Sequence, residues 1–327
     1  YCPLVMTEIP SAFLLVLLLW TLHYFRGRWH AAIFGGLILG VLTLMRPASL
    51  LLFPLVALSE MRPFSRAALR AGAALGIALL LVMPWTIRNC KRMDGCALVS
   101  TNGGWNLAIG AITETGRFQT LRGKDGCPNV TGQVQQDDCW AHVGWEKIKQ
   151  APGHWLALAP KKLAQTFDHE SFAIEYVHEA DPGAWPEDRR EAARGLLTAA
   201  HLALLAAAAL SIVAVPLGRL SRQEQYWQIG LLVLLSGLIF YGIADQEHPF
   251  HWLIVAAPAL AFAPIPGRPY LGAVGRMAMA AVLVTALTHV IFFGEDRYHL
   301  FLSPLLCILA AAALRQSERV AREPAGA

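Results

Sequence analysis

Runs of apolar residues separated by short basic turns fill both ends of this sequence, and they constrain its fold more than any motif does. A helix needs about 20 apolar residues to cross the hydrocarbon core of a bilayer, and somewhat shorter helices are tolerated inside a bundle. By that measure we expect nine membrane spans in the 327-residue chain. They cover residues 9–25, 30–45, 48–60, 68–87, 195–217, 227–244, 251–265, 271–293 and 300–314.

The composition agrees with a membrane protein. Only 15% of the residues are charged and 55% are hydrophobic, whereas a soluble globular chain has about 25% charged residues. This apolar content excludes a disordered chain, and a net charge of +4 is too small for a nucleic-acid-binding surface. The sequence therefore predicts an all-α polytopic membrane protein with no nucleic-acid partner.

The charged residues gather in the middle of the chain. Residues 88–194 hold about half of the 27 Lys and Arg and more than half of the 23 Asp and Glu. We therefore expect a small, helix-rich external domain inserted after the fourth span. Within it, residues 136–150 are expected to form a helix that ends before Pro152, and the acidic segment 168–194 is expected to be a loop. The expected parts are the first half of a membrane bundle (1–87), the external domain (88–194), the second half of the bundle (195–317) and a cytoplasmic tail (318–327).

The placement of arginines predicts the orientation of the chain, because basic residues are retained on the cytoplasmic side of a membrane. With nine spans in series, nearly all arginines in the short loops fall on one face. Residues 88–194 then lie on the opposite, external face. The arginines of the predicted cytoplasmic face are Arg26, Arg28, Arg62, Arg66, Arg70, Arg219, Arg222, Arg268, Arg276, Arg315, Arg319 and Arg322.

Four of the six cysteines lie in the external domain. An oxidising exterior permits the disulfides Cys90–Cys96 and Cys127–Cys139. The alternative is four free thiols. Spacings of six and twelve residues with no histidine nearby do not resemble a zinc site.

Ionisable residues at the predicted outer ends of the spans are the sharpest functional signal, because a charge there is costly unless it is paired or used. One arginine at such an end is usually an anchor whose side chain reaches the interface. Three of them, on the face that is otherwise poor in basic residues, favour a binding site, since guanidinium groups suit phosphate oxygens. We expect a lipid phosphate to be bound by Arg46, Arg88, Arg297, Tyr298 and His299, with Glu8 in a supporting catalytic role.

Amide side chains and a glycine pair follow the fourth predicted span. The amides can form hydrogen bonds with hydroxyl-rich ligands, and the glycines allow a close approach of the backbone. The plainer interpretation is ordinary turn chemistry, for which Asn-Gly-Gly is typical. The residues that we expect to contact a sugar or an acceptor are Asn89, Asn102, Gly103, Gly104 and Asn106.

The histidines do not predict a metal site. Glu247, His248 and His251 have a ligand-like spacing, but Pro249 disrupts a shared helical face. The external histidines are scattered, and we expect them to be solvated. They are His142, His154, His169 and His178.

The motifs together resemble a known family. Residues 84–89 (Pro-Trp-Thr-Ile-Arg-Asn), 100–104 (Ser-Thr-Asn-Gly-Gly) and 106–110 (Asn-Leu-Ala-Ile-Gly) closely resemble a stretch shared by bacterial GT-C-type membrane glycosyltransferases, relatives of the protein O-mannosyltransferases and the lipid A aminoarabinose transferases. Thr7-Glu8, Arg46-Pro47 and Arg297-Tyr298-His299 are further matches. The resemblance covers residues 1 to about 314. Each motif is short, and their order along the predicted spans makes the match more specific.

The resemblance implies an enzyme of the bacterial inner membrane. Such enzymes transfer a sugar from a polyprenyl-phosphate carrier to a lipid, glycan or protein acceptor outside the cytoplasm, usually with inversion. A carboxylate takes the proton of the acceptor, and basic side chains stabilise the departing lipid phosphate. No cofactor is implied with certainty, and a divalent cation remains an option.

The family's principal acidic motif lies in the loop after the first span, and no such loop precedes Tyr1. We therefore expect the main catalytic base to lie upstream of Tyr1. We also expect this chain to be a fragment that does not turn over alone.

Two other function classes fit parts of the pattern. A transporter or flippase would use the outer arginines and carboxylates to line a path for a polar or lipid-linked substrate, but transporters place such charges near the bilayer midplane. A non-catalytic membrane protein would use residues 88–194 to bind a partner and would not depend on a lipid phosphate. We favour the glycosyltransferase because the charged groups gather at one edge.

Overall fold

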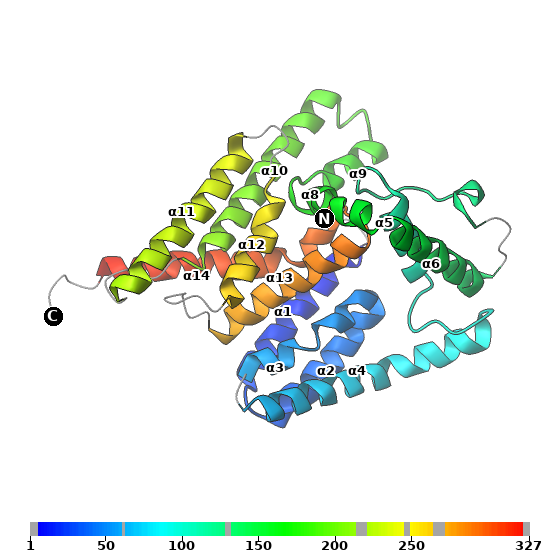
Figure 1. The fold of residues 1–327 in the computed structure, drawn as a ribbon, viewed down its shortest axis with the longest axis horizontal. Coiled ribbons are helices and arrows are strands. Elements are labelled where there is room, and N and C mark those ends of the chain that lie inside the picture. Colours follow the sequence, from blue (N-terminus) through cyan, green and yellow to red (C-terminus); the bar gives the residue numbers. More distant parts are fainter. Residues whose placement is uncertain are drawn as a thin grey trace. The chain divides into compact units, whose positions relative to one another are not determined.

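In the part of the chain that the computed structural model describes, the regular elements are helices (Figure 1), apart from one isolated β-bridge between Arg117 and Gly294. The structure describes residues 6–60, 63–127, 132–213, 221–244, 249–263 and 272–322, with side chains as far as residue 312. Within these ranges, 14 α-helices are joined by turns and short 3-10 helices. The prediction of an all-α fold is therefore confirmed.

Four helices among the described residues are long and apolar enough to cross a membrane. The shortest of them has 19 residues and extends about 28 Å, close to the thickness of about 30 Å of a hydrocarbon core. These helices suggest a multi-pass membrane protein. They are α4 (Phe64–Arg92), α10 (Glu187–Leu210), α11 (Arg222–Ala244) and α13 (Ala273–Ile291).

The prediction of nine spans is wrong, because the other apolar runs form shorter helices. The helices α1 (Glu8–Tyr24) and α2 (Trp29–Met45) have 17 residues each. The run at 48–60 is divided near Pro54 into the 3-10 helix η1 (Pro47–Leu52) and α3 (Leu55–Glu60), since proline cannot donate a helical hydrogen bond. The helix α12 (His251–Phe262) has 12 residues, and the apolar part of α14 (Ser303–Arg322) ends at Ala312.

The predicted orientation of the chain assigned each arginine to a face of the membrane by assuming nine spans in series. Because the nine spans are not found, the arginines no longer support that orientation. Three of those arginines, Arg62, Arg219 and Arg268, lie outside the described residues, as do residues 323–327 of the expected tail.

The chain divides into two compact units. The N-terminal unit comprises Cys2–Gln165 and Val284–Glu295, and the C-terminal unit comprises Thr166–Leu283 and Asp296–Ala327. The boundaries expected after residues 87 and 194 fall inside α4 and α10. In chain order, α4 continues from an apolar stretch into a polar one, and α10 continues from a polar stretch into an apolar one.

In the N-terminal unit, glycines let α2 lie directly against α4. A Cβ added at Gly36 would come within 2.9 Å of Ile77 Cβ, and one at Gly40 within 3.0 Å of Leu81 Cβ. Small residues four positions apart allow helices to approach closely in a bilayer, where apolar surface alone gives helices little reason to associate. This spacing therefore fixes where the two helices meet.

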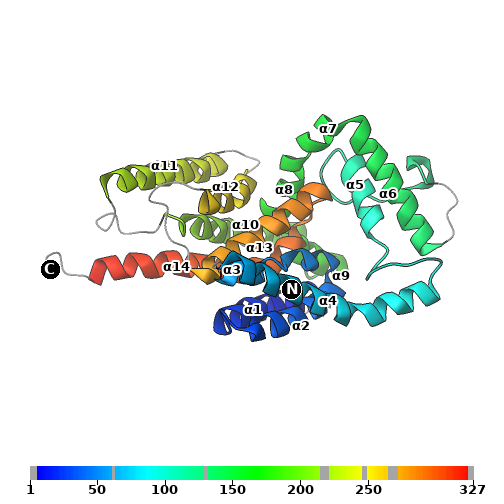
Figure 2. The same ribbon diagram turned by 60° about the horizontal axis from the view of Figure 1, so that its bottom comes forward.

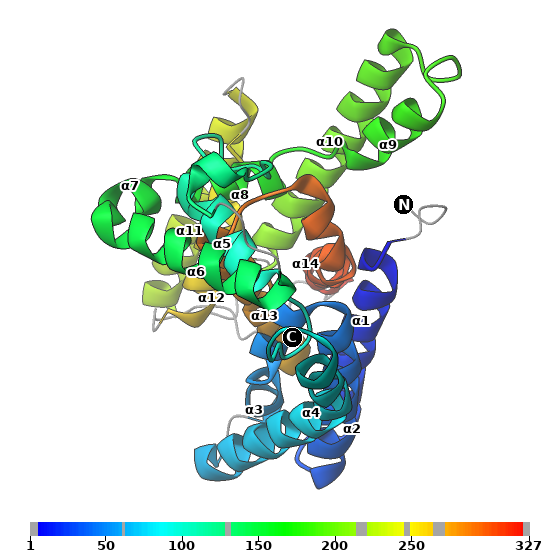
Figure 3. The ribbon, with the colours of Figure 1, turned by 90° about the vertical axis from the view of Figure 1, so that its right-hand side faces the viewer.

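The polar segment after α4 also belongs mainly to the N-terminal unit, and it folds into helices. Figure 3 shows α5 (Gly103–Ile112) beside α6 (Gln133–Gln150), which α7 (Pro152–Ala157) and α8 (Ala159–Phe167) follow. The helix expected at 136–150 and its end before Pro152 are confirmed. Disulfides join Cys90 to Cys96 and Cys127 to Cys139, which decides between bridged and free thiols.

The helices α5 and α6 cross at glycines. A Cβ added at Gly104 would lie 2.7 Å from the backbone nitrogen of Ala141, and one at Gly144 would lie 2.8 Å from that of Ala108. A Cβ at Gly103 would meet only Asp137 Oδ2, at 3.9 Å, which is an ordinary contact. The close crossing thus requires Gly104 but not its neighbour.

Replacing Gly104 with alanine should therefore lower the melting temperature of the protein in detergent. The backbone of α6 must shift to admit the methyl group, and such overpacking costs about 1–3 kcal/mol. Gly103→Ala is the matched control and should keep or raise the melting temperature, because alanine is the better helix former. Equal melting temperatures for the two variants would contradict the packing role of Gly104.

The C-terminal unit packs around α10. This helix contacts α14 and α12, and α11 lies beside both α10 and α12 (Figure 2). The segment 168–194, which we expected to be a loop, contains α9 (Phe172–Ala180) and the beginning of α10. Pro186 precedes α10, and Glu187 and Asp188 lie in its first turn, where negative charge is favourable. The acidic, proline-containing composition thus marks a helix start.

Candidate functional site

A short segment of the C-terminal unit connects several of its elements. Residues 166–172 (Thr-Phe-Asp-His-Glu-Ser-Phe) run from the end of α8 to the start of α9. Their carbonyl, carboxylate and amide groups form hydrogen bonds with α10, α12 and the 3-10 helix η4 (Asp296–Phe301). This segment is therefore the centre of the candidate site.

Two histidines and a glutamate meet on this segment. His299 of η4 is fully buried, and its Nδ1 lies 2.7 Å from the carbonyl oxygen of Thr166. Because a carbonyl oxygen only accepts, Nδ1 carries a proton. The other nitrogen, Nε2, lies 2.7 Å from Glu170 Oε2. His201 of α10 stacks on His299 with ring centroids 3.8 Å apart, and its Nε2 donates to the carbonyl of Phe167 at 3.1 Å.

Two aspartates hold the starts of helices in the same unit. Asp168 accepts hydrogen bonds from the backbone nitrogen of His251 at 2.5 Å and from its ring Nδ1 at 2.6 Å, where α12 begins. Asp296 Oδ2 accepts from the backbone nitrogens of Ser171 and Phe172, both at 2.6 Å, where α9 begins. Negative charge at a helix N-terminus is stabilising, so these carboxylates fix the two helices against residues 166–172.

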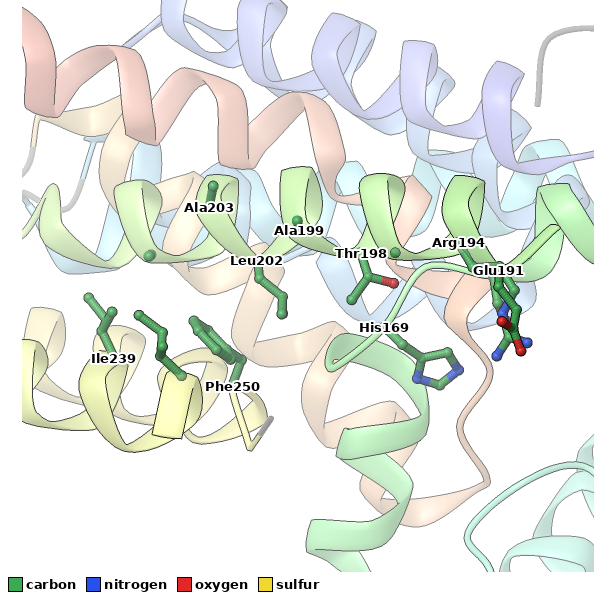
Figure 4. A pocket seen from close by; sticks show the side chains of 13 residues that line it. His169, Glu191, Arg194, Thr198, Ala199, Leu202, Ala203, Ile239 and Phe250 are labelled. Atoms are coloured by element: carbon green, nitrogen blue, oxygen red, sulfur yellow. The ribbon is translucent and has the colours of Figure 1, made fainter. Parts of the chain in front are cut away.

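A pocket of about 690 Å³ runs along one face of α10 in this unit (Figure 4). Its lining residues on α10 recur every three or four positions, as one helical face requires. The volume lies within the range of about 300–1,000 Å³ that is usual for ligand sites. The lining residues are His169, Ser171, Glu191, Arg194, Gly195, Thr198, Ala199, Leu202, Ala203, Ala206, Ile239, Ile243 and Phe250.

The pocket is polar at one end and apolar at the other. Figure 4 shows His169, Glu191 and Arg194 at one end and Ile239 and Phe250 at the other. The polar end lies by the first turns of α10, and the lining becomes aliphatic further along the helix. Such a surface suits an amphiphile with a charged head and an apolar tail.

The structure brings Glu8 and Arg46 together. Glu8 is buried at the start of α1, and its Oε1 lies 3.6 Å from Nη1 of Arg46 at the end of α2. The pair neutralises the two charges where α1 and α2 meet. Both side chains thus have a structural role in the N-terminal unit, and a supporting catalytic role for Glu8 stays a prediction.

Residues 84–89 attach the loop after α4 to that helix. The buried Asn89 donates from Nδ2 to the carbonyl oxygens of Ala97 at 3.1 Å and Val99 at 3.2 Å, and Trp85 Nε1 donates to Val99 at 2.9 Å. Arg88 is exposed and donates to Asn89 Oδ1 at 3.0 Å. Both ends of the Asn89 amide are thus engaged within the protein, while Arg88 stays accessible to a ligand.

The other predicted sugar-binding residues lie at the start of α5. Gly104 is buried against α6, whereas Asn102 and Gly103 are exposed and Asn106 is half-buried. Burial raises the pKa of Asp137, which faces this helix start and accepts a backbone hydrogen bond from it. Packing therefore accounts for Gly104, and the other three residues are accessible to a ligand.

Arg297, Tyr298 and His299 lie together on η4, in the C-terminal unit. The guanidinium carbon of Arg297 lies 5.1 Å from the ring centroid of Phe172, and its Nη2 lies 3.3 Å from the Tyr298 hydroxyl. Phe172 directly follows the pocket residue Ser171. Arg297 and Tyr298 are half-buried, whereas His299 has no exposed surface with which to touch a phosphate.

The polar end of the pocket was not predicted from the sequence. His169 was expected to be solvated, and Glu191 and Arg194 were placed in a loop, but all three line the pocket. Their signal was the spacing of Glu191, Arg194 and Thr198, which share one face of a helix once α10 is known to begin at Glu187.

The sequence predicted that Glu247, His248 and His251 do not form a metal site, and the structure describes only the last of these residues. Glu247 and His248 lie outside the described residues, and His251 pairs with Asp168.

Lys162 of α8 is buried in the N-terminal unit, whereas its neighbour Lys161 is exposed. Its Nζ donates to the carbonyl oxygen of Val290 at 3.0 Å and lies 5.2 Å from the ring centroid of Trp155. Burial lowers the pKa of Lys162 from 10.5 to about 8. A buried cation at neutral pH thus faces a carbonyl group and an aromatic ring.

This burial predicts a pH dependence of stability that Lys162→Met should remove. Between pH 8 and 10.5 the unfolded chain keeps a proton that folded Lys162 has lost, so the free energy of unfolding rises with pH relative to the variant. The slope approaches about 1.4 kcal/mol per pH unit at most, and it vanishes below that range because both states are protonated. Urea unfolding in detergent from pH 7 to 10 measures the slope, with Lys161→Met as the exposed control. If the free energies of unfolding of the wild type and of Lys162→Met changed with pH in parallel, the predicted effect of Lys162 burial would be wrong.

No protein-family model, curated protein or solved structure matches this chain. The resemblance to GT-C glycosyltransferases therefore stays a prediction from motifs.

Proposed function

We propose that this protein is a membrane glycosyltransferase that takes a sugar from a polyprenyl-phosphate carrier and transfers it to a lipid, glycan or protein acceptor on the non-cytoplasmic side of a bacterial inner membrane. The observation that carries the proposal is the pocket along α10, which is polar at the start of the helix and aliphatic further along. Because α10 has the length and apolarity of a membrane span, the aliphatic part of the pocket would lie at the depth of the hydrocarbon core.

The two ends of the pocket complement the two ends of a polyprenyl phosphate. Leu202, Ala206 and Ile239 offer apolar surface, and each methylene group that they bury contributes about 0.8 kcal/mol to binding. Arg194 offers a fork of N–H donors that fits phosphate oxygens, and His169 supplies a second polar group at that end. Arg194 also pairs with Glu175 of α9, with Nη1 and Oε1 3.3 Å apart.

The disulfides support an external position for the segment between α4 and α10, because such bonds persist in oxidising compartments. Both disulfides lie before α7, and α10 begins beyond this segment. The first turns of α10 would then enter the membrane from outside. The polar end of the pocket would hold the phosphate at the outer surface, within reach of an external acceptor.

In the proposed reaction, an acceptor oxygen or nitrogen attacks the anomeric carbon and forms the glycosidic bond. The bond from that carbon to the phosphate oxygen breaks with inversion, and the lipid phosphate leaves with the electron pair. The acceptor proton passes to a carboxylate. Arg194 would stabilise the charge that develops on the phosphate, and a hydrogen bond to a charged group contributes about 1.5–3 kcal/mol. Arg297, which lies in the same unit, is a further candidate for that role.

Replacing Arg194 with alanine should lower sugar release from the donor by about 10–100-fold, since hydrogen bonds to charged groups contribute about 1.5–3 kcal/mol. Proteoliposomes that hold the complete natural protein, with any residues that precede Tyr1, and a donor labelled in its sugar measure the rate. Arg189→Ala on the same helix is the matched control. The guanidinium of Arg189 lies 4.6 Å from the Trp185 ring and donates to the carbonyl of Ala184, outside the pocket lining.

Equal rates for the Arg194→Ala and Arg189→Ala variants would count against the proposal. Movement of the labelled lipid across the membrane with no sugar release would favour a flippase.

A bulky residue in the pocket should exclude the lipid. Ala199 and Ala200 are both exposed on α10, but only Ala199 lines the pocket. Ala199→Trp should reduce the retention of polyprenyl phosphate by the purified protein about tenfold or more, because losing the burial of two methylene groups already costs about 1.6 kcal/mol. Native mass spectrometry measures this retention. Ala200→Trp should retain the lipid, and equal retention by both variants would show that the lipid binds elsewhere.

A further inference from the structure

The buried cluster of Glu170, His201 and His299 has the donor set of a transition-metal site. One ligand atom from each residue lies within 4.8 Å of those of the other two. The exposed fraction is 7% for Glu170, 6% for His201 and 0% for His299. Two imidazoles and one carboxylate form a set of ligands that catalytic zinc sites use, with a fourth position open.

The hydrogen bonds around the cluster orient both rings as metal sites do. A histidine that binds a metal donates its other ring N–H to a carbonyl or carboxylate group, which fixes the tautomer. Here the acceptors are the consecutive carbonyls of Thr166, 2.7 Å from His299 Nδ1, and Phe167, 3.1 Å from His201 Nε2. The lone pairs then lie on Nε2 of His299 and on Nδ1 of His201.

Either a proton or a metal ion must lie between His299 and Glu170. The Nδ1 proton of His299 is committed to the carbonyl of Thr166, so Nε2 and the Glu170 carboxylate are both acceptors, and they lie 2.7 Å apart. A single proton satisfies this pair alone. A metal ion would use the lone pairs of all three residues at once.

We propose that Glu170, His201 and His299 bind one Zn²⁺ ion or a similar divalent transition-metal ion. Bond lengths of about 2.0–2.2 Å require the ligand atoms to close in on one another and the stacked rings, now inclined by 22°, to rotate apart. The ion would join residues 166–172, α10 and η4. Glu170 lies between the pocket residues His169 and Ser171, so the ion would sit next to the polar end of the pocket. The proposal does not depend on the proposed function.

The proposed site is tested by measuring the metal content of the full chain and by titrating the chain with Zn²⁺. The protein is purified in detergent without a polyhistidine tag, treated with a chelator and titrated with Zn²⁺. We expect one tightly bound ion per chain. His299→Ala, His201→Ala and Glu170→Gln should each weaken binding by more than about 100-fold, since even the loss of a group that only orients a ligand costs 10–100-fold. With Co²⁺ as the probe, the wild type should show the absorption bands of a tetrahedral complex.

Two variants separate metal binding from folding. His154 is exposed on α7, so His154→Ala should bind Zn²⁺ like the wild type. His299→Cys keeps a zinc ligand at the position and should restore much of the affinity that His299→Ala loses. A wild type that binds no Zn²⁺ after titration would overturn the proposal, because the cation between His299 and Glu170 would then be a proton. Zn²⁺ binding that is the same in His299→Ala and His154→Ala would also overturn it.

Discussion

The pairing of buried carboxylates with histidines and helix starts is the interaction on which the C-terminal unit depends. Removing a carboxylate from water is costly unless a partner compensates for it. Asp168 and Glu170 lie two residues apart on one segment, and they meet His251 of α12 and His299 of η4. Packing between apolar helices in a bilayer gives little directional preference, so these polar contacts set how the elements meet.

The sequence predicted what local signals encode. The helical fold class and the four helices of membrane length follow from apolar runs, and α6 follows from its helix formers and from the proline that ends it. The sequence left two alternatives open for Cys90, Cys96, Cys127 and Cys139, disulfides or free thiols, and the structure shows the disulfides. Helix length was harder to predict than apolarity, because a residue such as Pro54 ends a helix without lowering the hydropathy of its neighbourhood.

The buried polar cluster could not be predicted from the sequence because its members are distant in the chain. Glu170 and His299 are 129 positions apart, and neither carries a motif that indicates the other. The burial of Lys162 could not be predicted for the same reason. Lys161 and Lys162 are adjacent lysines in the sequence, and only tertiary packing buries the second and leaves the first exposed. Arg194 was missed for a simpler reason, since the start of α10 was placed too late.

The structural roles of the motif residues limit what the family resemblance can support. Asn89 attaches a loop to α4, Gly104 permits a helix crossing, and Arg46 neutralises Glu8. Each role would require that residue type in any protein with this local fold, whatever reaction the protein catalyses. The motifs are therefore better evidence for a shared arrangement of helices than for a shared reaction. Evidence for the reaction must come from residues that do more than hold the fold. Arg194 pairs with Glu175 of α9 and also lines the polar end of the α10 pocket, so it is placed to serve both purposes.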